Sequence, residues 1–240
     1  MFVSAPQLKR DPLGARALMT VPSGIPVSAQ RIDETLDATF GSQLRADGFQ
    51  LARPRMWVRA RTSDITDLFQ IQAIKGATLT PCWGWSLTFV PHVRNGHLRW
   101  HRTLKAAQFD VIDDPLDLAL PESVPSLLLH TRRGENALLA QARTLCPFAV
   151  AQADRFWQRA QAITDLRKVL FELKARKNVR FDFYNYVAHP VSLAFSLARL
   201  GEHDAARDEL SRYIHFRDGT PDLRDGLLTA LDAASPRRGA

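Results

Sequence analysis

Apolar residues recur at every fourth position in the first clearly patterned part of the chain, residues 28–48. The positions are Ile32, Leu36, Phe40 and Leu44. This spacing places them on one stripe of a helix. Ser28 stands where an N-cap is favoured, and Gly48 stands where the left-handed residue that ends a helix is favoured. The pattern predicts a helix over this range.

The hydrophobic period then shortens to two, which is typical of half-buried strands. In residues 55–61, Met56, Val58 and Ala60 alternate with Arg55, Trp57, Arg59 and Arg61. In residues 68–74, Phe69, Ile71 and Ala73 alternate with Gln70 and Gln72. We expect two strands joined by a turn that contains Ser63 and Asp64, followed by a loop around Pro81.

The segment from Cys82 to Lys105 carries the signal of a β-hairpin. The dipeptide Asn95-Gly96 favours a two-residue type I′ turn. Because proline cannot donate to the ladder, we expect an edge or a bulge near Pro91. A turn at Asn95-Gly96 sets the cross-strand pairs: Arg94 with His97, Val93 with Leu98, His92 with Arg99, Pro91 with Trp100, and Val90 with His101.

Side chains of this predicted hairpin divide between two faces. The apolar face holds Trp83, Trp85, Leu87, Phe89, Val93, Leu98, Trp100 and Leu104, with Arg102 as its exception. The polar face holds Ser86, Thr88, His92, Arg94, His97, Arg99, His101, Thr103 and Lys105. The tryptophans are therefore predicted to be core residues, and the basic residues are predicted to face water.

Helical patterns dominate the chain after residue 125. Before that point Pro115, Pro121 and Pro125 predict an irregular connection. Helices are predicted over residues 166–177, over two segments of 189–216 that are separated by Gly201, and over 221–234. Residues 189–216 resemble one helical hairpin of the tetratricopeptide type, with Ala206 and Leu210 pointing inward.

These elements predict an α+β fold with an N-terminal helix, a mainly antiparallel sheet of about four strands, and a helical C-terminal half packed on the sheet. The expected organisation is a loose lead-in over residues 1–27, a helix with the sheet over 28–124, a helical subdomain over 125–234, and a basic tail over 235–240.

Composition narrows the class of protein. The 240-residue chain is 45% hydrophobic and 24% charged, as in ordinary globular proteins. It lacks an apolar run of membrane-spanning length and the apolar stretch of a signal peptide, so no membrane association is expected. Its cysteines, Cys82 and Cys146, are too few for a disulfide framework, which indicates reduced thiols and a cytoplasmic protein. The net charge of +7 favours acidic partners in general.

Familiar catalytic and cofactor motifs are absent from the sequence, so no cofactor is expected. A metal site on the predicted hairpin is not expected either, because its histidines stand among arginines without a carboxylate. The acidic run over residues 110–117 is interpreted as a turn or helix start, with Asp114 as the cap before Pro115. The aromatic run over residues 181–189 is interpreted as core rather than as a pocket.

The polar face of the predicted hairpin is the strongest candidate site, although an ordinary solvated face would have the same pattern. Arginine and histidine side chains bind phosphate and carboxylate groups. The leading hypothesis is a non-enzymatic binding or interaction protein that meets an acidic protein or a nucleic acid. The alternative is an enzyme for a phosphorylated or nucleotide-like substrate, with His101 first as acid or base. The candidate residues are His92, Arg94, His97, Arg99, His101 and Lys105, extended by Arg59 and Arg61 if their strand lies alongside.

A resemblance to an uncharacterised bacterial family, a domain of unknown function, covers about residues 28–105. It is carried by Gly48-Phe49, by Trp57 with Arg59, by the alternation from Phe69 to Gln72, and by the aromatic motif from Trp83 to Phe89. The resemblance implies an α+β fold and an intracellular bacterial setting. It implies no activity and no catalytic residue.

Overall fold

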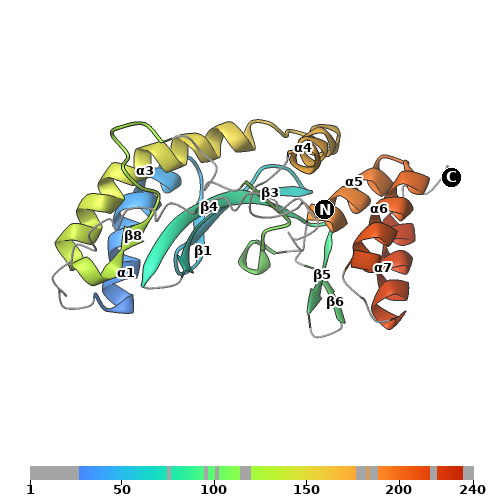
Figure 1. Ribbon diagram of the computed structural model, residues 1–240, viewed down its shortest axis with the longest axis horizontal. Helices are drawn as coiled ribbons and strands as arrows, with labels where there is room; N and C mark the ends of the chain where they lie inside the picture. Colours follow the sequence, from blue (N-terminus) through green and yellow to red (C-terminus); the bar gives the residue numbers. More distant parts are fainter. Residues whose placement is uncertain are drawn as a thin grey trace, which may run out of the picture.

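The computed structural model describes residues 27–74, 77–94, 97–100, 103–113, 120–176, 183, 189–216 and 221–234. The predicted α+β class is confirmed: helices cover a mainly antiparallel sheet, and the C-terminal half is helical (Figure 1). The strands are β1 (Gln50–Arg53), β2 (Met56–Ala60), β3 (Ile65–Ile74), β4 (Thr78–Leu87), β5 (Pro91–Arg94), β6 (His97–Trp100), β7 (Val111–Asp113) and β8 (Leu129–His130). The longer helices are α1 (Ala29–Leu36), α3 (Glu135–Trp157), α4 (Ile163–Ala175), α5 (His189–Arg199), α6 (His203–Phe216) and α7 (Pro221–Ala234).

The N-terminal helix is interrupted at its centre. Helix α1 is followed by a π-helical turn, η1 (Asp37–Gly41), and by α2 (Ser42–Ala46). The Ser28 hydroxyl caps α1 and Gly48 has a φ of +84°, so both predicted ends are confirmed. The π turn directs the Asp37 carboxylate to the Arg45 guanidinium and to the indole N–H of Trp57. The hydrogen bond from Arg45 lowers the pKa of Asp37 below its usual value.

The strands predicted over residues 55–61 and 68–74 are confirmed as β2 and β3, with the turn at Ser63 and Asp64 between them. The sequence predicts one buried and one exposed face for these strands, but most of their residues are buried on both faces. Trp57 lies in the main core, whereas Met56 and Val58 on the opposite face form a second, smaller core. Both faces of β2 are therefore covered.

Strand β4 begins earlier than the sequence predicts, because the expected loop around Pro81 is part of the strand. Pro81 lies opposite Ile71 in the β3–β4 ladder, and Ile71 donates its N–H to Arg55 O on the far side of β3. In such a non-hydrogen-bonded pair both nitrogens point outward. The Pro81 nitrogen therefore faces the gap where the partner of β4 changes from β8 to β7, and no ladder bond is lost.

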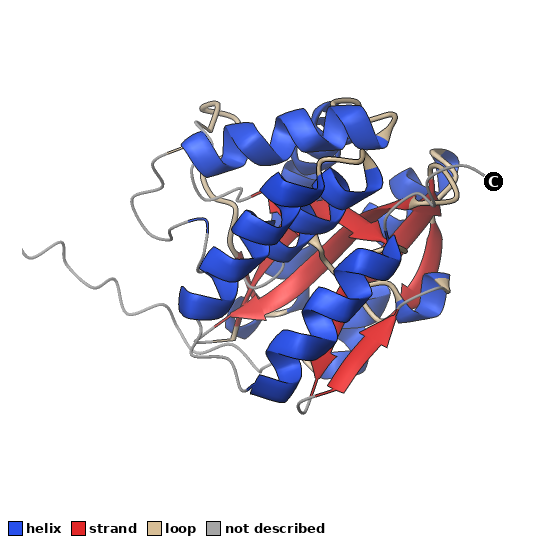
Figure 2. Ribbon diagram, turned by 90° about the vertical axis from the view of Figure 1, so that its right-hand side faces the viewer, coloured by secondary structure: helices blue, strands red, loops and turns tan. Residues whose placement is uncertain are grey.

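The main sheet has the order β1-β2-β3-β4-β7, with β8 paired to the other end of β4. Helices α1 and α3 lie over one face, and in Figure 2 the C-terminal helices lie toward the viewer, in front of the long strands. The other face is covered by residues 104–109. Close approach of β7 requires Gly84, because a Cβ there would lie 1.9 Å from the carbonyl oxygen of Val111.

Helices α4 to α7 confirm the helical prediction for the C-terminal half, whereas β7 and β8 were not predicted. Gly201 ends α5 with a φ of +81°, and Ala206 and Leu210 are fully buried as expected. One hydrophobic core runs from Leu36 to Leu231 and so joins the N-terminal and C-terminal halves. Among the described residues, no helix is long and apolar enough to cross a membrane.

Candidate functional site

The hairpin formed by β5 and β6 has the register predicted from the sequence. Pro91 lies opposite Trp100, His92 opposite Arg99, Val93 opposite Leu98, and Arg94 opposite His97. The turn residues Asn95 and Gly96 lie outside the described residues, as do His101 and Arg102. The hairpin forms a sheet of its own, because the chain turns at residues 88–90 between β4 and β5. The break in the predicted first strand therefore precedes Pro91.

The tryptophans of this region have different environments. Trp83 and Trp85 are fully buried in the main core, as predicted. Trp100 is 38% exposed, so the prediction that it is a core residue is wrong. Its ring meets Phe195 of α5 edge-on, with 6.3 Å between the ring centroids. The hairpin packs against the C-terminal helices through one side of Trp100 and leaves the rest of the indole accessible.

His92 does not face open water as the sequence predicts. Its side chain is 20% exposed, and its Nε2 lies 2.8 Å from Oδ1 of the fully buried Asp110. The other carboxylate oxygen of Asp110 accepts a hydrogen bond of 2.6 Å from the backbone N–H of Leu87. Ser86, predicted on the same water-facing side, is also buried. The acidic run over residues 110–113 thus ties the hairpin to the end of β4.

Arg59 and Arg61 belong to a buried ionic cluster with Asp67. Asp67 is fully buried on β3, and both guanidinium groups donate to its carboxylate over distances of 2.8–3.0 Å. The Arg59 guanidinium also lies over the ring of Phe49, 4.5 Å from its centroid. Their strand lies in the main sheet and not beside the hairpin. These two candidate residues are therefore separated from the others and have a buried counter-charge.

Of the remaining candidates, His97 and Arg99 lie on the hairpin itself. Both are exposed, and so is Lys105 in the short 3₁₀ helix η2 (Leu104–Ala106), which follows the hairpin in the chain and contacts β1 and β2 of the main sheet. No ion pair within the described part of the chain involves Arg99 or Lys105. Arg94 is placed on β5, but its side chain and His101 fall outside the description. We call His97, Arg99 and Lys105 the basic hairpin surface.

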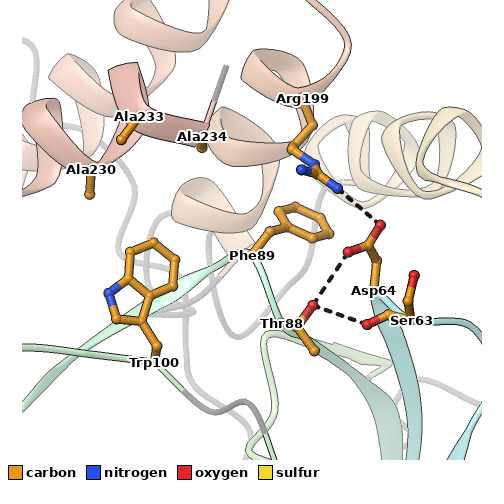
Figure 3. Close-up of a pocket in the computed structure, with 9 residues that line it drawn as sticks. All are labelled: Ser63, Asp64, Thr88, Phe89, Trp100, Arg199, Ala230, Ala233 and Ala234. Atoms are coloured by element: carbon orange, nitrogen blue, oxygen red, sulfur yellow. Dashed lines mark hydrogen bonds and ion pairs between the residues drawn. The ribbon is translucent and has the colours of Figure 1, made fainter. Parts of the chain in front are cut away.

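A cavity of about 480 Å³ lies on the other side of the hairpin (Figure 3). Its polar end is formed by the turn before β3, by Thr88 and by Arg199 at the end of α5. Its apolar end is formed by Trp100 and by the last turns of α7. The lining residues are Ser63, Asp64, Thr88, Phe89, Trp100, Arg199, Ala230, Ala233 and Ala234. Sequence reasoning missed this cavity, because its walls come from segments far apart along the chain.

Two titratable groups in the core are held in their neutral forms. His189 is buried, its Nε2 accepts a hydrogen bond from the Ile112 N–H, and burial lowers its pKa to about 4. Burial raises the pKa of the Cys146 thiol to about 12. These two side chains belong to the protein interior and lie outside the cavity described above.

Within the described ranges, no group of three or more His, Cys, Asp or Glu residues is arranged to hold a metal ion. No protein-family model, no curated protein and no solved structure matches the chain.

Proposed function

We propose that this is a non-enzymatic binding protein whose basic hairpin surface meets an acidic segment of a partner protein. The observation that carries the proposal is the exposure of His97 and Arg99 on a hairpin that extends away from the main sheet beside α7 (Figure 1), with Lys105 exposed in the segment that follows. Most of the ion pairs in the described structure engage arginines elsewhere, whereas Arg99 and Lys105 are left for an external carboxylate. An arginine fork binds a carboxylate with two parallel hydrogen bonds.

A protein partner is favoured over a nucleic acid by the small number of exposed cations among the described residues of this surface. Nucleic-acid binding proteins typically neutralise several phosphates along a continuous basic track. Three other candidate residues are already occupied: His92 contacts Asp110, and Arg59 and Arg61 share Asp67. The charge that remains fits a short acidic segment better than a phosphate backbone.

The enzyme alternative receives less support from the geometry. A general acid or base must converge with anion-binding groups on a concave site that holds the substrate. Among the described residues, no histidine lines the cavity of Figure 3, and His101 lies outside the description. The His92 Nε2 is directed at a buried carboxylate of the protein itself. An exposed surface for a partner is the better interpretation.

The proposal is tested by fluorescence anisotropy with a labelled Glu-rich peptide, titrated at several salt concentrations. Arg99→Glu combined with Lys105→Glu should weaken binding by about tenfold or more, because two attractive charges become repulsive. The matched control is Arg143→Glu with Arg212→Glu, which makes the same charge change at exposed positions of α3 and α6.

The proposal predicts that the control variant binds the peptide like the unchanged protein. Equal weakening by both double variants would mean that only net charge matters, and it would contradict a specific surface. If an oligothymidylate of equal charge binds more tightly than the peptide, and the hairpin variant loses that binding, then the partner is a nucleic acid and not a protein.

A further inference from the structure

We propose a second binding site, independent of the basic hairpin surface: the cavity between the hairpin, α5 and α7 binds a free α-amino acid with an apolar side chain. The cavity measures about 480 Å³, within the range of small-molecule sites. Its two ends differ in chemistry, with charged and hydroxyl groups at one end and aromatic and methyl groups at the other (Figure 3). A ligand that fits both ends has a polar head and an apolar body.

The polar end presents a cation and an anion side by side. Arg199 Nη2 lies 3.1 Å from Asp64 Oδ2, and both side chains are partly exposed, at 38% and 28%. Within the described structure Asp64 is the one hydrogen-bond acceptor of the Arg199 guanidinium, which keeps further N–H donors for a ligand. Within the described part of the chain, the other Asp64 oxygen accepts one long contact, of 3.4 Å from the Thr88 hydroxyl. Neither charged group is saturated by its neighbour.

The apolar end is a slot with aromatic and small walls. Trp100 leaves 38% of its surface exposed on one side, and Ala230, Ala233 and Ala234 of α7 form the other side. The small alanine side chains leave the slot open, and the ring of Phe89 lies between the slot and Arg199 (Figure 3). The Arg199 guanidinium lies 5.7 Å from the Phe89 ring centroid, which holds it at the boundary of the two ends.

Charge decides the class of ligand. Arg199 and Asp64 together carry no net charge, so a phosphate dianion would meet the nearby Asp64 carboxylate, and a simple amine would meet Arg199. A zwitterion satisfies both groups, with its carboxylate on the Arg199 fork and its ammonium on Asp64. Its side chain then lies along Trp100 and the alanines, where burial of apolar surface favours binding. A free amino acid such as phenylalanine or leucine has this arrangement.

The test is isothermal titration calorimetry with L-phenylalanine and L-leucine as probes. Two analogues each lack one half of the zwitterion: 3-phenylpropionate has no ammonium, and phenethylamine has no carboxylate. We expect at least one of the two amino acids to bind, and both analogues to bind about tenfold or more weakly, the loss of one charge-assisted contact. Inorganic phosphate should not compete. Analogue affinities equal to that of phenylalanine, or no binding of either amino acid, would overturn the proposal.

Two variants locate the site. Ala233→Leu fills the slot without touching a charge and should abolish binding, whereas Ala205→Leu, at an exposed alanine of α6, should not. Arg199→Met should also remove binding, and its control is Arg207→Met, which breaks an exposed pair with Asp232 outside the cavity. Full binding by Ala233→Leu protein would refute the location. Because Arg99 and Lys105 do not line the cavity, their double Glu variant should bind the amino acid normally, which separates this proposal from that of the hairpin surface.

Discussion

Replacement of Asp67 by asparagine tests whether Arg59 and Arg61 serve the fold. The Asp67 carboxylate is fully buried and accepts four hydrogen bonds from the two guanidinium groups. Asparagine keeps the size of the side chain but removes its charge, and it turns an NH₂ group toward one of the arginines. The change leaves two cations without their counter-charge, and Arg61 is only 11% exposed.

The expected decrease in the free energy of unfolding follows from the cost of removing one partner of a buried ion pair. Such a change typically lowers the free energy of unfolding by about 3–5 kcal/mol. Arg59 is 26% exposed and can recover some hydration, so the lower half of that range, about 3–4 kcal/mol, is expected. For a chain of this size that corresponds to a decrease in Tm of roughly 6–16 °C.

The assay is urea unfolding followed by circular dichroism, with the midpoint and the m-value fitted together. The control is Asp232→Asn, which breaks a similar pair with Arg207 whose side chains are both 53% exposed. It should cost less than about 1 kcal/mol. A loss below about 1 kcal/mol for Asp67→Asn as well would refute the account, because Arg59 and Arg61 would then not depend on their buried partner.

Three further predictions concern the core. Gly84→Ala should lower the free energy of unfolding by about 3 kcal/mol or more in urea melts, since its Cβ would lie 1.9 Å from a backbone oxygen. The control is Gly226→Ala in α7, where the nearest atom to the added Cβ is 3.6 Å away. It should be neutral or stabilising by up to about 1 kcal/mol. The pKa of His189 falls from 6.5 to about 4 on folding, so the unfolded chain takes up a proton on this side chain at a higher pH than the folded chain does. The stabilisation by neutral His189 is therefore fully present above pH 6.5. About 3 kcal/mol of the free energy of unfolding should be lost as the pH falls toward 4. Urea melts at both pH values should show a smaller loss for His189→Gln, and an equal loss would contradict the assignment. The Cys146 thiol, with a pKa of about 12, should react with a disulfide reagent at neutral pH far more slowly than the unfolded chain does, and equal rates would show that it is not buried.

Local chemistry made part of the fold predictable. The register of the hairpin depends on a two-residue turn, and Asn95-Gly96 marked its position within the sequence. The helix ends at Ser28 and Gly48 likewise depend on capping interactions within a few residues. These features need no knowledge of distant segments.

The partners of buried charges could not be predicted, because they depend on long-range packing. The alternation along the strand places His92 on the side predicted to face water. However, the segment that leads into β7 brings the Asp110 carboxylate next to its ring. Arg59 and Arg61 alternate like surface residues, but Asp67 on β3 pairs with them inside the fold. Periodicity reports which face a side chain lies on, and it does not report whether another segment covers that face.

The same limit applies to the cavity and to Trp100. The slot exists only where α7 returns beside the hairpin, more than a hundred residues later in the chain. The alternation of β6 places Trp100 on the inward-facing side. It does not show that Ala230 and Ala233 of α7 are too small to cover the Trp100 indole. Sequence reasoning therefore predicted the exposed His97 and Arg99 of β6 but not the cavity behind them.

The central claim is that the exposed basic side of the β5–β6 hairpin is a contact surface for an acidic protein segment. The most direct measurement is a ¹H–¹⁵N NMR titration of the full chain with the Glu-rich peptide. Saturable shifts concentrated at His97, Arg99 and Lys105 are the predicted result. Shifts spread evenly over exposed arginines, or confined to another part of the molecule, would contradict the claim.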